Sequence, residues 1–435
     1  MAMPTQTIES GLSAADEHAL LRHASFADAA LRDNPYAFFA AMRHQRPVFF
    51  DERVGMYLVA RHEDAQTVLR DSANYSAEKG YNDRFSKGFF DEFKAILEAE
   101  GGGYFPDAIK ADPPQHTRLR RLLEAAFSAH RVKQLEPQIR EIAAELARDM
   151  GRRGTVDGVR DFAVPMTIRV ICRQLGISEF DADQIRRWAH ALMQQIGLTQ
   201  SREQMLEHAR LVCECQNYLI AQIEDRRRAP KEDMISDLVH ARVDGEDELS
   251  FAEIVSLVRA LLVAGHETTQ TGMSSLVLTV ATRPDIARQL RDNVDDDRIA
   301  TRFVSELLRQ EPPIKITSRM TLHEVSLGGV RLPQGAHLLV VYGSANNDEA
   351  EFPDPRRFNL DRPNLGRAIT FGAGHHRCVG AALASMEIKV AAQELVRHLG
   401  RIELTIPAGE VPHVDSLATH GIAALPLLVK AVDAP

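Results

Sequence analysis

A single cysteine among glycines is the first sign of chemistry in this sequence. Residues 371–380 read Phe-Gly-Ala-Gly-His-His-Arg-Cys-Val-Gly, with Cys378 between Gly374 and Gly380 and a long apolar helical pattern after it. Glycine permits backbone conformations and close approaches that a β-carbon would forbid. We therefore interpret the segment as a loop that folds tightly around a flat ligand and directs the Cys378 sulfur toward it. A buried structural cysteine after a glycine turn is the alternative.

A second cluster lies inside a long predicted helix. Ser250 and Glu253 form a capping box, apolar residues continue to Val280, and Pro284 marks the end. About 32 residues at 1.5 Å each would span roughly 48 Å. This helix contains Ala-Gly-His-Glu-Thr-Thr at residues 264–269. A structural helix needs neither a glycine, which costs about 1 kcal/mol relative to alanine, nor an acid on a face fit for burial. A polar cluster at a helix kink is the alternative.

Both clusters resemble motifs of the cytochrome P450 family. The loop resembles its haem-ligating pattern Phe-Gly-x-Gly-x-His-x-Cys-x-Gly, and the helix resembles its oxygen-binding motif Ala/Gly-Gly-x-Asp/Glu-Thr-Thr/Ser. The resemblance implies that the Cys378 thiolate is the axial ligand of the iron of haem b. The other residues of these motifs that it assigns to cofactor binding are Phe371, Gly372, Gly374, His376, Gly380, Ala264 and Gly265.

The resemblance also gives Thr268 and Glu267 catalytic roles. The release of one oxygen atom of dioxygen as water consumes protons, and we expect Thr268 to steer them and Glu267 to relay them from solvent. General acid assistance of this kind contributes typically about 10²–10⁴-fold.

Basic residues elsewhere match the positions at which the family binds the haem propionates. Asp112-Pro113-Pro114 precedes a predicted helix in which His116 and Arg120 are four residues apart and share one face. A solvated basic face is the alternative to propionate binding. The resemblance implies the same role for Arg319 and lets His376 help to neutralise the propionates.

A structural network is expected around Glu306 and Arg309, which match the Glu-x-x-Arg motif of the family. The third member there is the arginine of a Pro-x-Arg-Phe segment, which points to Arg357 in this chain. We interpret these three residues as part of the scaffold.

Several segments are expected to surround an apolar substrate. Residues 76–111 are predicted to be a long, irregular, aromatic-bearing loop, which is more often functional than incidental. Residues 183–196 and 202–228 resemble the helix pair that roofs the pocket in the family. The side chains predicted to face substrate are Leu261, Ala264, Ile314 and Ile316.

The predicted fold is mainly α with small β-sheets (α+β), similar to the cytochrome P450 fold, with the long central helix over a haem bound by the cysteine loop. Residues 135–241 show an almost wholly helical pattern. Short strands are expected at residues 47–50, 56–60, 325–327, 330–332, 337–341, 401–405 and 424–429. We expect an N-terminal tail at residues 1–14 and a single domain at 15–435, although length alone allows roughly three domains.

Composition narrows the class of protein. Of 435 residues, 44% are hydrophobic and 26% charged, as in soluble globular proteins. The net charge of −9 argues against a nucleic-acid partner. The N-terminus resembles no signal peptide and no apolar run reaches transmembrane length, so we expect a cytoplasmic protein. Cys172, Cys213 and Cys215 are interpreted as reduced packing residues.

These observations predict a haem-dependent monooxygenase that inserts one oxygen atom from O2 into a small apolar organic substrate. No flavin or iron–sulfur motif is present, so electrons should come from a ferredoxin or flavodoxin-like donor, and NAD(P)H should act only through a reductase. A monomer is expected. The basic residues proposed as a docking face for that donor, with a solvated face as the alternative, are Arg118, Arg121, Arg131, Lys133 and Arg377.

Two rival functions are weighed against this one. Glu267 and Thr268 argue against a peroxide-driven haem-thiolate peroxygenase, because such an enzyme needs no proton delivery to dioxygen. The aromatic segment and roofing helices argue against a non-catalytic haem sensor. Terpenoid, steroid, fatty-acid-like and aromatic substrates all remain open.

Overall fold

The computed structural model describes residues 12–82, 90–105, 110–126, 129–178, 181–197, 201–242 and 247–432. Its contacts divide the chain into two compact units. The first unit comprises Met1–Asp83, Ser305–Cys378 and Asp415–His420, and the second comprises Arg84–Val304, Val379–Val414 and Gly421–Pro435. The single domain expected from the sequence stays a prediction.

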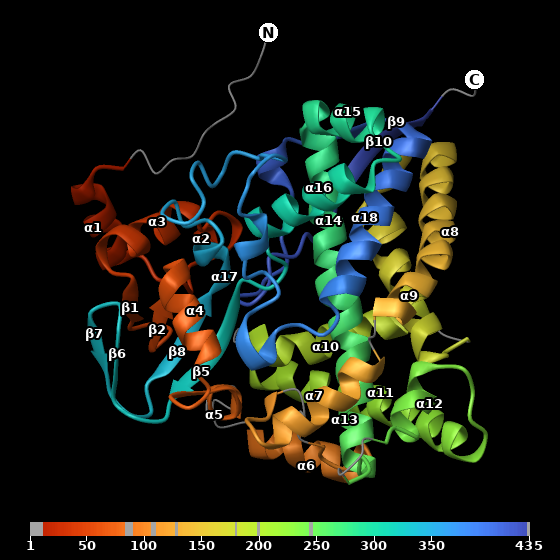
Figure 1. The fold of residues 1–435 in the computed structure, drawn as a ribbon, viewed down its shortest axis with the longest axis horizontal. Helices are drawn as coiled ribbons and strands as arrows, with labels where there is room; N and C mark the ends of the chain where they lie inside the picture. The colour runs from red at the N-terminus through yellow and green to blue at the C-terminus, as the bar shows by residue number, and fades with distance from the viewer. Residues whose placement is uncertain are drawn as a thin grey trace. The chain divides into compact units, whose positions relative to one another are not determined.

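The first unit is built on a five-stranded sheet with the order β1-β2-β8-β5-β3 (Figure 1). Only β2 and β8 pair in parallel. Every residue of β5 is buried, so this strand lies in the centre of the unit. The strands are β1 (Val48–Asp51), β2 (Met56–Val59), β3 (Tyr75–Ser76), β5 (Ile316–Thr321) and β8 (His337–Val341), with a separate hairpin of β6 (Val325–Leu327) and β7 (Val330–Leu332).

Short helices complete the first unit. The α-helices are α1 (Ala14–His23), α2 (Ala29–Asp33), α3 (Tyr36–Gln45), α4 (His62–Arg70), α5 (Ala77–Asn82) and α17 (Tyr342–Ala345), with 3-10 turns η4 (Leu365–Arg367) and η5 (Gly374–His376). Helix α16 (Asp297–Gln310) begins in the second unit and ends in the first.

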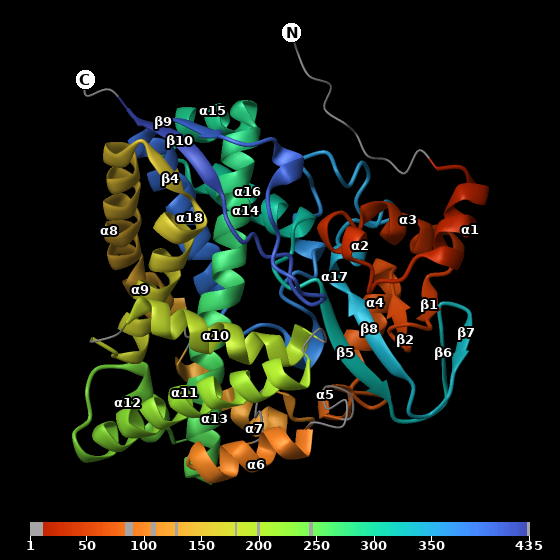
Figure 2. The same ribbon diagram turned by 180° about the vertical axis from the view of Figure 1, so that it is seen from behind.

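The second unit is mostly helical. Its α-helices before the central helix are α6 (Phe90–Glu100), α7 (Gln115–Ala126), α8 (Ala129–Arg153), α9 (Val164–Leu175), α10 (Ala182–Gly197), α11 (Arg202–Arg228) and α12 (Met234–Val239), and a π-turn η2 (Val159–Ala163) precedes α9. After the central helix come α15 (Pro284–Asp292), the start of α16, α18 (Ala381–His398) and the 3-10 turn η6 (Ala408–Glu410). Helix α18 packs against α8 and α14, and β10 (Pro426–Ala431) pairs with both β4 (Thr155–Asp157) and β9 (Leu399–Leu404) (Figure 2).

The central helix consists of α13 (Phe251–Val263), a π-helical segment η3 (Ala264–Thr268) and α14 (Thr269–Thr282). The predicted capping box is confirmed, because the Ser250 side chain accepts from the Glu253 amide and the Glu253 side chain accepts from the Ser250 amide. The sequence predicted this helix as one continuous element, and the structure adds a π-helical turn at the polar cluster. Such turns frequently occur at functional sites.

The predicted fold class is confirmed, and one local prediction is wrong. Residues 76–111 were expected to be irregular, yet they contain α5 and α6. Apolar side chains of α6, including Leu97, pack with Ala209 and Val212 of α11, so the apolar spacing here belongs to a helix. In the described part of the chain, no helix is both long and apolar enough to cross a membrane.

Candidate active site

The Cys378 loop belongs to the first unit and is shaped by its own backbone. The amide of Cys378 donates to the carbonyl of Phe371 over 2.8 Å. Gly372 and Gly374 have φ angles of 71° and 66°, in the left-handed region that glycine adopts readily. A β-carbon on Gly374 would lie 2.3 Å from the carbonyl oxygen of Leu69 in α4. The loop therefore packs against α4 in a way that position 374 allows only to glycine.

The chemistry of the cysteines fits a haem-iron ligand at position 378. Cys378 is exposed, whereas Cys172, Cys213 and Cys215 are buried. Burial raises the pKa of these three thiols to about 12, 11 and 12, respectively. Because the thiolate is the form that binds metal, Cys378 is the cysteine suited to ligate iron.

Arg319 and the cysteine loop both lie near the hydroxyl of Tyr342. The β-carbon position of Gly372 lies 3.4 Å from the Tyr342 hydroxyl, and the charges of both Arg319 and Cys378 act on that hydroxyl. Burial is the main cause that raises the pKa of Tyr342 to about 12. Arg319 is itself buried in β5, with one amino group 2.7 Å from the carbonyl of Ser318. A buried cation near the cysteine loop suits a propionate partner.

The oxygen-motif residues lie together in the π-helical segment of the second unit. The Thr268 hydroxyl donates to the carbonyl of Ala264 over 2.8 Å. Because the single hydroxyl proton is used in this bond, the lone pairs of the Thr268 oxygen can accept a hydrogen bond from another donor. At Gly265, a β-carbon would lie 2.7 Å from Cδ1 of Ile171, so glycine permits α9 to approach here.

Glu267 is poised to exchange a proton near neutral pH. Burial raises the pKa of its carboxyl from 4.5 to about 7, although the Arg186 charge acts in the opposite direction. An acid works best as a proton donor when its pKa lies near the working pH. The pair of residues can therefore hold a proton at Glu267 and pass one through the Thr268 hydroxyl.

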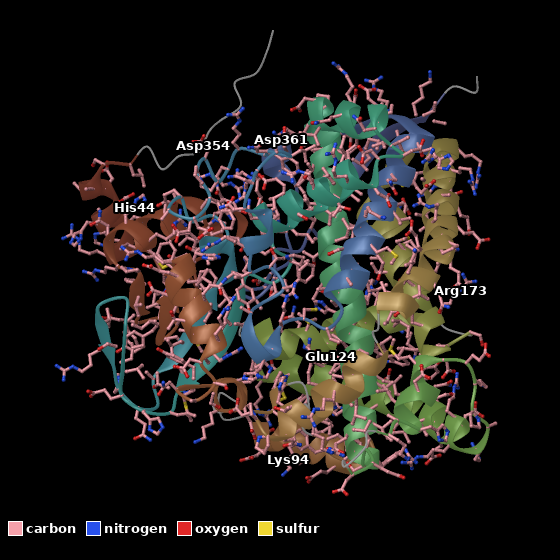
Figure 3. All side chains as sticks on the ribbon, viewed as in Figure 1. His44, Lys94, Glu124, Arg173, Asp354 and Asp361 are labelled. Atoms are coloured by element: carbon pink, nitrogen blue, oxygen red, sulfur yellow. The ribbon has the colours of Figure 1, made fainter. Side chains whose placement is uncertain are left out.

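His116 and Arg120 lie on α7, as the sequence predicted. His116 is buried, and Arg120 forms an ion pair at 2.7 Å with Glu124 one turn later. Figure 3 labels Glu124. Arg118 donates to Glu253 over 2.6 Å and to the carbonyl of Glu248 over 2.8 Å. Its guanidinium thus fastens α7 to the start of α13, and we remove Arg118 from the predicted docking face. The Arg131 side chain lies outside the described residues.

The expected role of Arg357 is wrong. Glu306 pairs with Arg309 at 2.8 Å and with Arg362 at 3.1 Å, and all three side chains are buried. Arg357 is exposed and contributes its backbone carbonyl, which accepts from Arg362. The turn after buried Phe358 places Arg362 in the interior, where its guanidinium also donates to the carbonyl of Pro353. The motif pointed to the nearer arginine, and only the path of this turn distinguishes the two.

The sequence reasoning also missed a partly buried cluster around Glu311. Arg356 donates to Glu311 over 2.6 Å, the His420 ring nitrogen Nδ1 lies 3.1 Å from it, and the Tyr36 hydroxyl donates to it as well. Burial opposes ionisation, yet Arg356 and His420 hold the pKa of Glu311 well below its ordinary value. These residues come from four separate segments, so no local pattern could indicate the cluster.

The predicted substrate-facing residues occupy different environments. Leu261 and Ile316 are buried, Ala264 is exposed, and Ile314 packs against the core and forms a bridge with Thr419. The remaining motif residue, Gly380, caps the start of α18 with a φ of −81° and belongs to the second unit. Contact with substrate stays a prediction for Leu261, Ala264, Ile314 and Ile316.

Comparison with known proteins decides the family. The family model described as Cytochrome P450 matches residues 33–423. The chain belongs to the cytochrome P450 family.

Among the relatives of this P450 are bacterial hydroxylases. It is 36% identical over 390 residues to "Mycinamicin IV hydroxylase/epoxidase" of Micromonospora griseorubida, covering 88% of this chain and 91% of the relative. It is 32% identical over 403 residues to "6-deoxyerythronolide B hydroxylase" of Saccharopolyspora erythraea, covering 90% and 95%. The solved structure of cytochrome P450 CYP109Q5 from Chondromyces apiculatus matches with a TM-score of 0.82 and 31% identity, covering 94% of this chain and 99% of the other.

Family membership assigns haem as the cofactor and monooxygenation as the activity of this P450. Like other bacterial members, it draws electrons from redox partners and acts on a small organic substrate. The monooxygenase reading is therefore favoured over the peroxygenase and the sensor.

Proposed function

We propose that this P450 acts as a monomer that hydroxylates or epoxidises a bulky apolar substrate of the macrolide kind, using electrons from a ferredoxin and its NAD(P)H-dependent reductase. The observation that carries the use of dioxygen is the Glu267–Thr268 pair, with an acid whose pKa is about 7 beside a hydroxyl already oriented by Ala264. Hydrogen peroxide already carries the two protons that leave as water, so a peroxide-driven enzyme needs no proton supplied from solvent.

The residues that would hold the haem divide by role. Cys378 would ligate the iron, and Arg319, His116, Arg120 and His376 would bind or neutralise the propionates. Bound haem supplies the binding and reductive activation of dioxygen and the transfer of one oxygen atom to substrate. Glu267 would hold a proton near neutral pH, and the Thr268 hydroxyl would accept it while turning its own proton from the Ala264 carbonyl toward the acceptor. Leu261, Ala264, Ile314 and Ile316 would supply apolar contacts to the substrate.

The names of relatives support the substrate class. Two of them are described as acting on mycinamicin IV and 6-deoxyerythronolide B, and a third is "Erythromycin C-12 hydroxylase". A relative described as "Biotin biosynthesis cytochrome P450" is 30% identical, so the family resemblance alone does not fix the substrate.

A basic surface of the first unit supports an acidic electron donor such as a ferredoxin. A cavity of about 1190 Å³ borders the cysteine loop at Gly372 and Gly374. The lining also holds Glu63, Asp348, Glu349 and Glu351, with Arg367 paired to Glu351 and Arg43 paired to Glu349. The positive charge proposed next to the loop that carries the iron ligand therefore comes from Arg70 and Arg377. Of the residues predicted from the sequence, Arg377 belongs to this surface; Arg121 and Lys133 are exposed on α7 and α8.

Turnover with defined electron sources tests this function. Wild-type protein supplied with ferredoxin, reductase and NADPH should form oxidised product from a macrolide substrate, and peroxide alone should support little turnover. Thr268→Ala should still bind substrate, with its normal shift of the haem absorption band, but should divert most reducing equivalents into hydrogen peroxide. Tight coupling in Thr268→Ala, or equal turnover with peroxide alone, would contradict the proposal.

A further inference from the structure

The third residue of the π-helical segment, His266, carries a buried imidazole that the proposed chemistry does not use. Its side chain is 0% exposed, whereas Ala264 and Thr268 on the same segment are accessible. Nδ1 of His266 lies 2.8 Å from the hydroxyl oxygen of Thr167 in α9. The imidazole therefore joins the segment to a neighbouring helix rather than facing a ligand.

The partners of Thr167 determine which ring nitrogen carries the proton. The hydroxyl lies 3.1 Å from the carbonyl of Ala163 and 3.3 Å from that of Val164, and both oxygens can only accept. We assign the single hydroxyl proton to one of these carbonyls, which makes the Thr167 oxygen the acceptor from Nδ1–H of His266. Burial, with a smaller effect of the Arg186 charge, lowers the pKa of His266 to about 3, so the ring is neutral and its Nε2 is unprotonated.

A second contact from α9 meets the same segment. Ile171 lies four residues after Thr167 on the same face of α9, and its Cδ1 is 2.7 Å from the position of a β-carbon on Gly265. Two successive turns of α9 thus contact two consecutive residues of the central helix, at the turn where the helix departs from α geometry. A close steric contact and a directional hydrogen bond together fix both the separation and the rotation of this turn.

We propose that His266 is a positioning residue, whose hydrogen bond to Thr167 sets the rotation of the 264–268 segment and hence the direction of the Glu267 carboxyl and the Thr268 hydroxyl. This inference rests on the proposed proton-delivery function. The imidazole is fully buried against α9 and acts through the two residues that follow it. Loss of the bond leaves α9 holding the segment by the apolar contact alone, and proton delivery becomes less well directed.

Removing only the Thr167 hydroxyl tests the inference in the holoenzyme. Thr167→Val should reduce the ratio of product formed to NADPH consumed roughly fivefold, the effect of losing about one hydrogen bond. Thr167→Ser retains the hydroxyl and should restore coupling. Ser274→Ala is the matched control, because Ser274 is equally buried and its hydroxyl donates, among the described residues, to the carbonyl of Gln270 in its own helix.

Nitrogen-15 NMR of histidine-labelled protein in its diamagnetic ferrous carbon monoxide form gives a readout independent of activity. One histidine should remain neutral from pH 5 to 8 with its proton on Nδ1, and Thr167→Val should shift that signal. A proton on Nε2 of this histidine would overturn the inference, as would wild-type coupling in Thr167→Val or equal uncoupling in Thr167→Ser.

A second pair of variants covers the case in which Thr167→Val fails to take up haem. His266→Asn keeps a donor where Nδ1 lies and should couple better than His266→Leu; equal coupling would overturn the inference. Thr268→Ala separates the two proposals. If Thr268→Ala uncouples and Thr167→Val does not, only the positioning role fails, and if Thr268→Ala stays coupled, the proton-delivery function fails.

Discussion

Glu267 is a half-buried acid placed beside a hydroxyl, and its raised pKa has a measurable consequence. Burial favours the protonated form, so ionising the carboxyl costs more free energy in the folded protein than in the unfolded chain. Its folded pKa of about 7 exceeds the ordinary value of 4.5. The stability that comes from the neutral acid is therefore fully present below pH 4.5 and is lost as pH rises through 7.

Glu267→Gln tests this assignment by its pH dependence. The variant cannot ionise, so its unfolding free energy relative to wild type should rise between pH 5 and 7 and then level off, by on the order of 2 kcal/mol. Denaturant unfolding at several pH values measures the difference. The same variant should lose roughly 10²-fold in turnover at pH 7 if the acid delivers protons. Parallel stability curves would show that the carboxyl is not buried as described.

At the scale of elements, the chain between α16 and the cysteine loop is held by a buried charge cluster. Glu306 and Arg309 are 0% exposed and Arg362 is 3% exposed, so each charge depends on its partners in place of water. Removing one member of such a cluster leaves an uncompensated buried charge.

Arg362→Ala should therefore destabilise the protein by about 3 kcal/mol, and Arg357→Ala should change stability by less than about 0.5 kcal/mol. Thermal or denaturant unfolding of both variants, with haem content measured alongside, provides the comparison. Equal effects of the two substitutions would contradict the assignment of Arg362 as the third member.

What the sequence could predict at this scale depended on whether the signal was local. The Ser250 capping box, the β6–β7 hairpin and the helices α10 and α11 follow from short-range patterns and are confirmed as elements, whereas the lid role of α10 and α11 stays a prediction. The choice between Arg357 and Arg362 depends on how a turn bends. The hydrogen bond between Thr167 and His266 joins residues 99 positions apart, and no periodicity indicates it.

The local geometry of the predicted site could be anticipated where chemistry limits the residue type, and the cofactor-binding roles of these residues stay predictions. Cys378, Gly374 and Gly265 occupy positions at which the thiolate, the left-handed backbone or the close approach of a helix allows few alternatives. The Glu311 cluster could not be predicted, because an ordinary glutamate, tyrosine and histidine become a network only when separate segments meet.

At the scale of the whole molecule, the net charge of −9 would repel an acidic electron donor unless positive charge gathers locally. The arginines beside the cysteine loop are the proposed site of that charge. Arg377→Gln combined with Arg70→Gln should raise the KM for ferredoxin several-fold and flatten its dependence on ionic strength.

Arg331→Gln is the control for this prediction, because Arg331 is 78% exposed on the β6–β7 hairpin of the same unit and is absent from the cavity lining. Electron-transfer rates measured over a series of salt concentrations distinguish the two surfaces. An unchanged rate and salt dependence in the Arg377 variant would place the donor elsewhere.

The central claim is that the Cys378 sulfur, presented by its glycine-constrained loop, ligates the haem iron. The most direct test is the absorption spectrum of the reduced protein under carbon monoxide, for wild type and Cys378→His. Wild type should show the red-shifted band of a thiolate-ligated ferrous carbonyl, and Cys378→His should show the band of an imidazole-ligated haem. An imidazole-type band in wild type, or a thiolate-type band that survives in Cys378→His, would contradict the account.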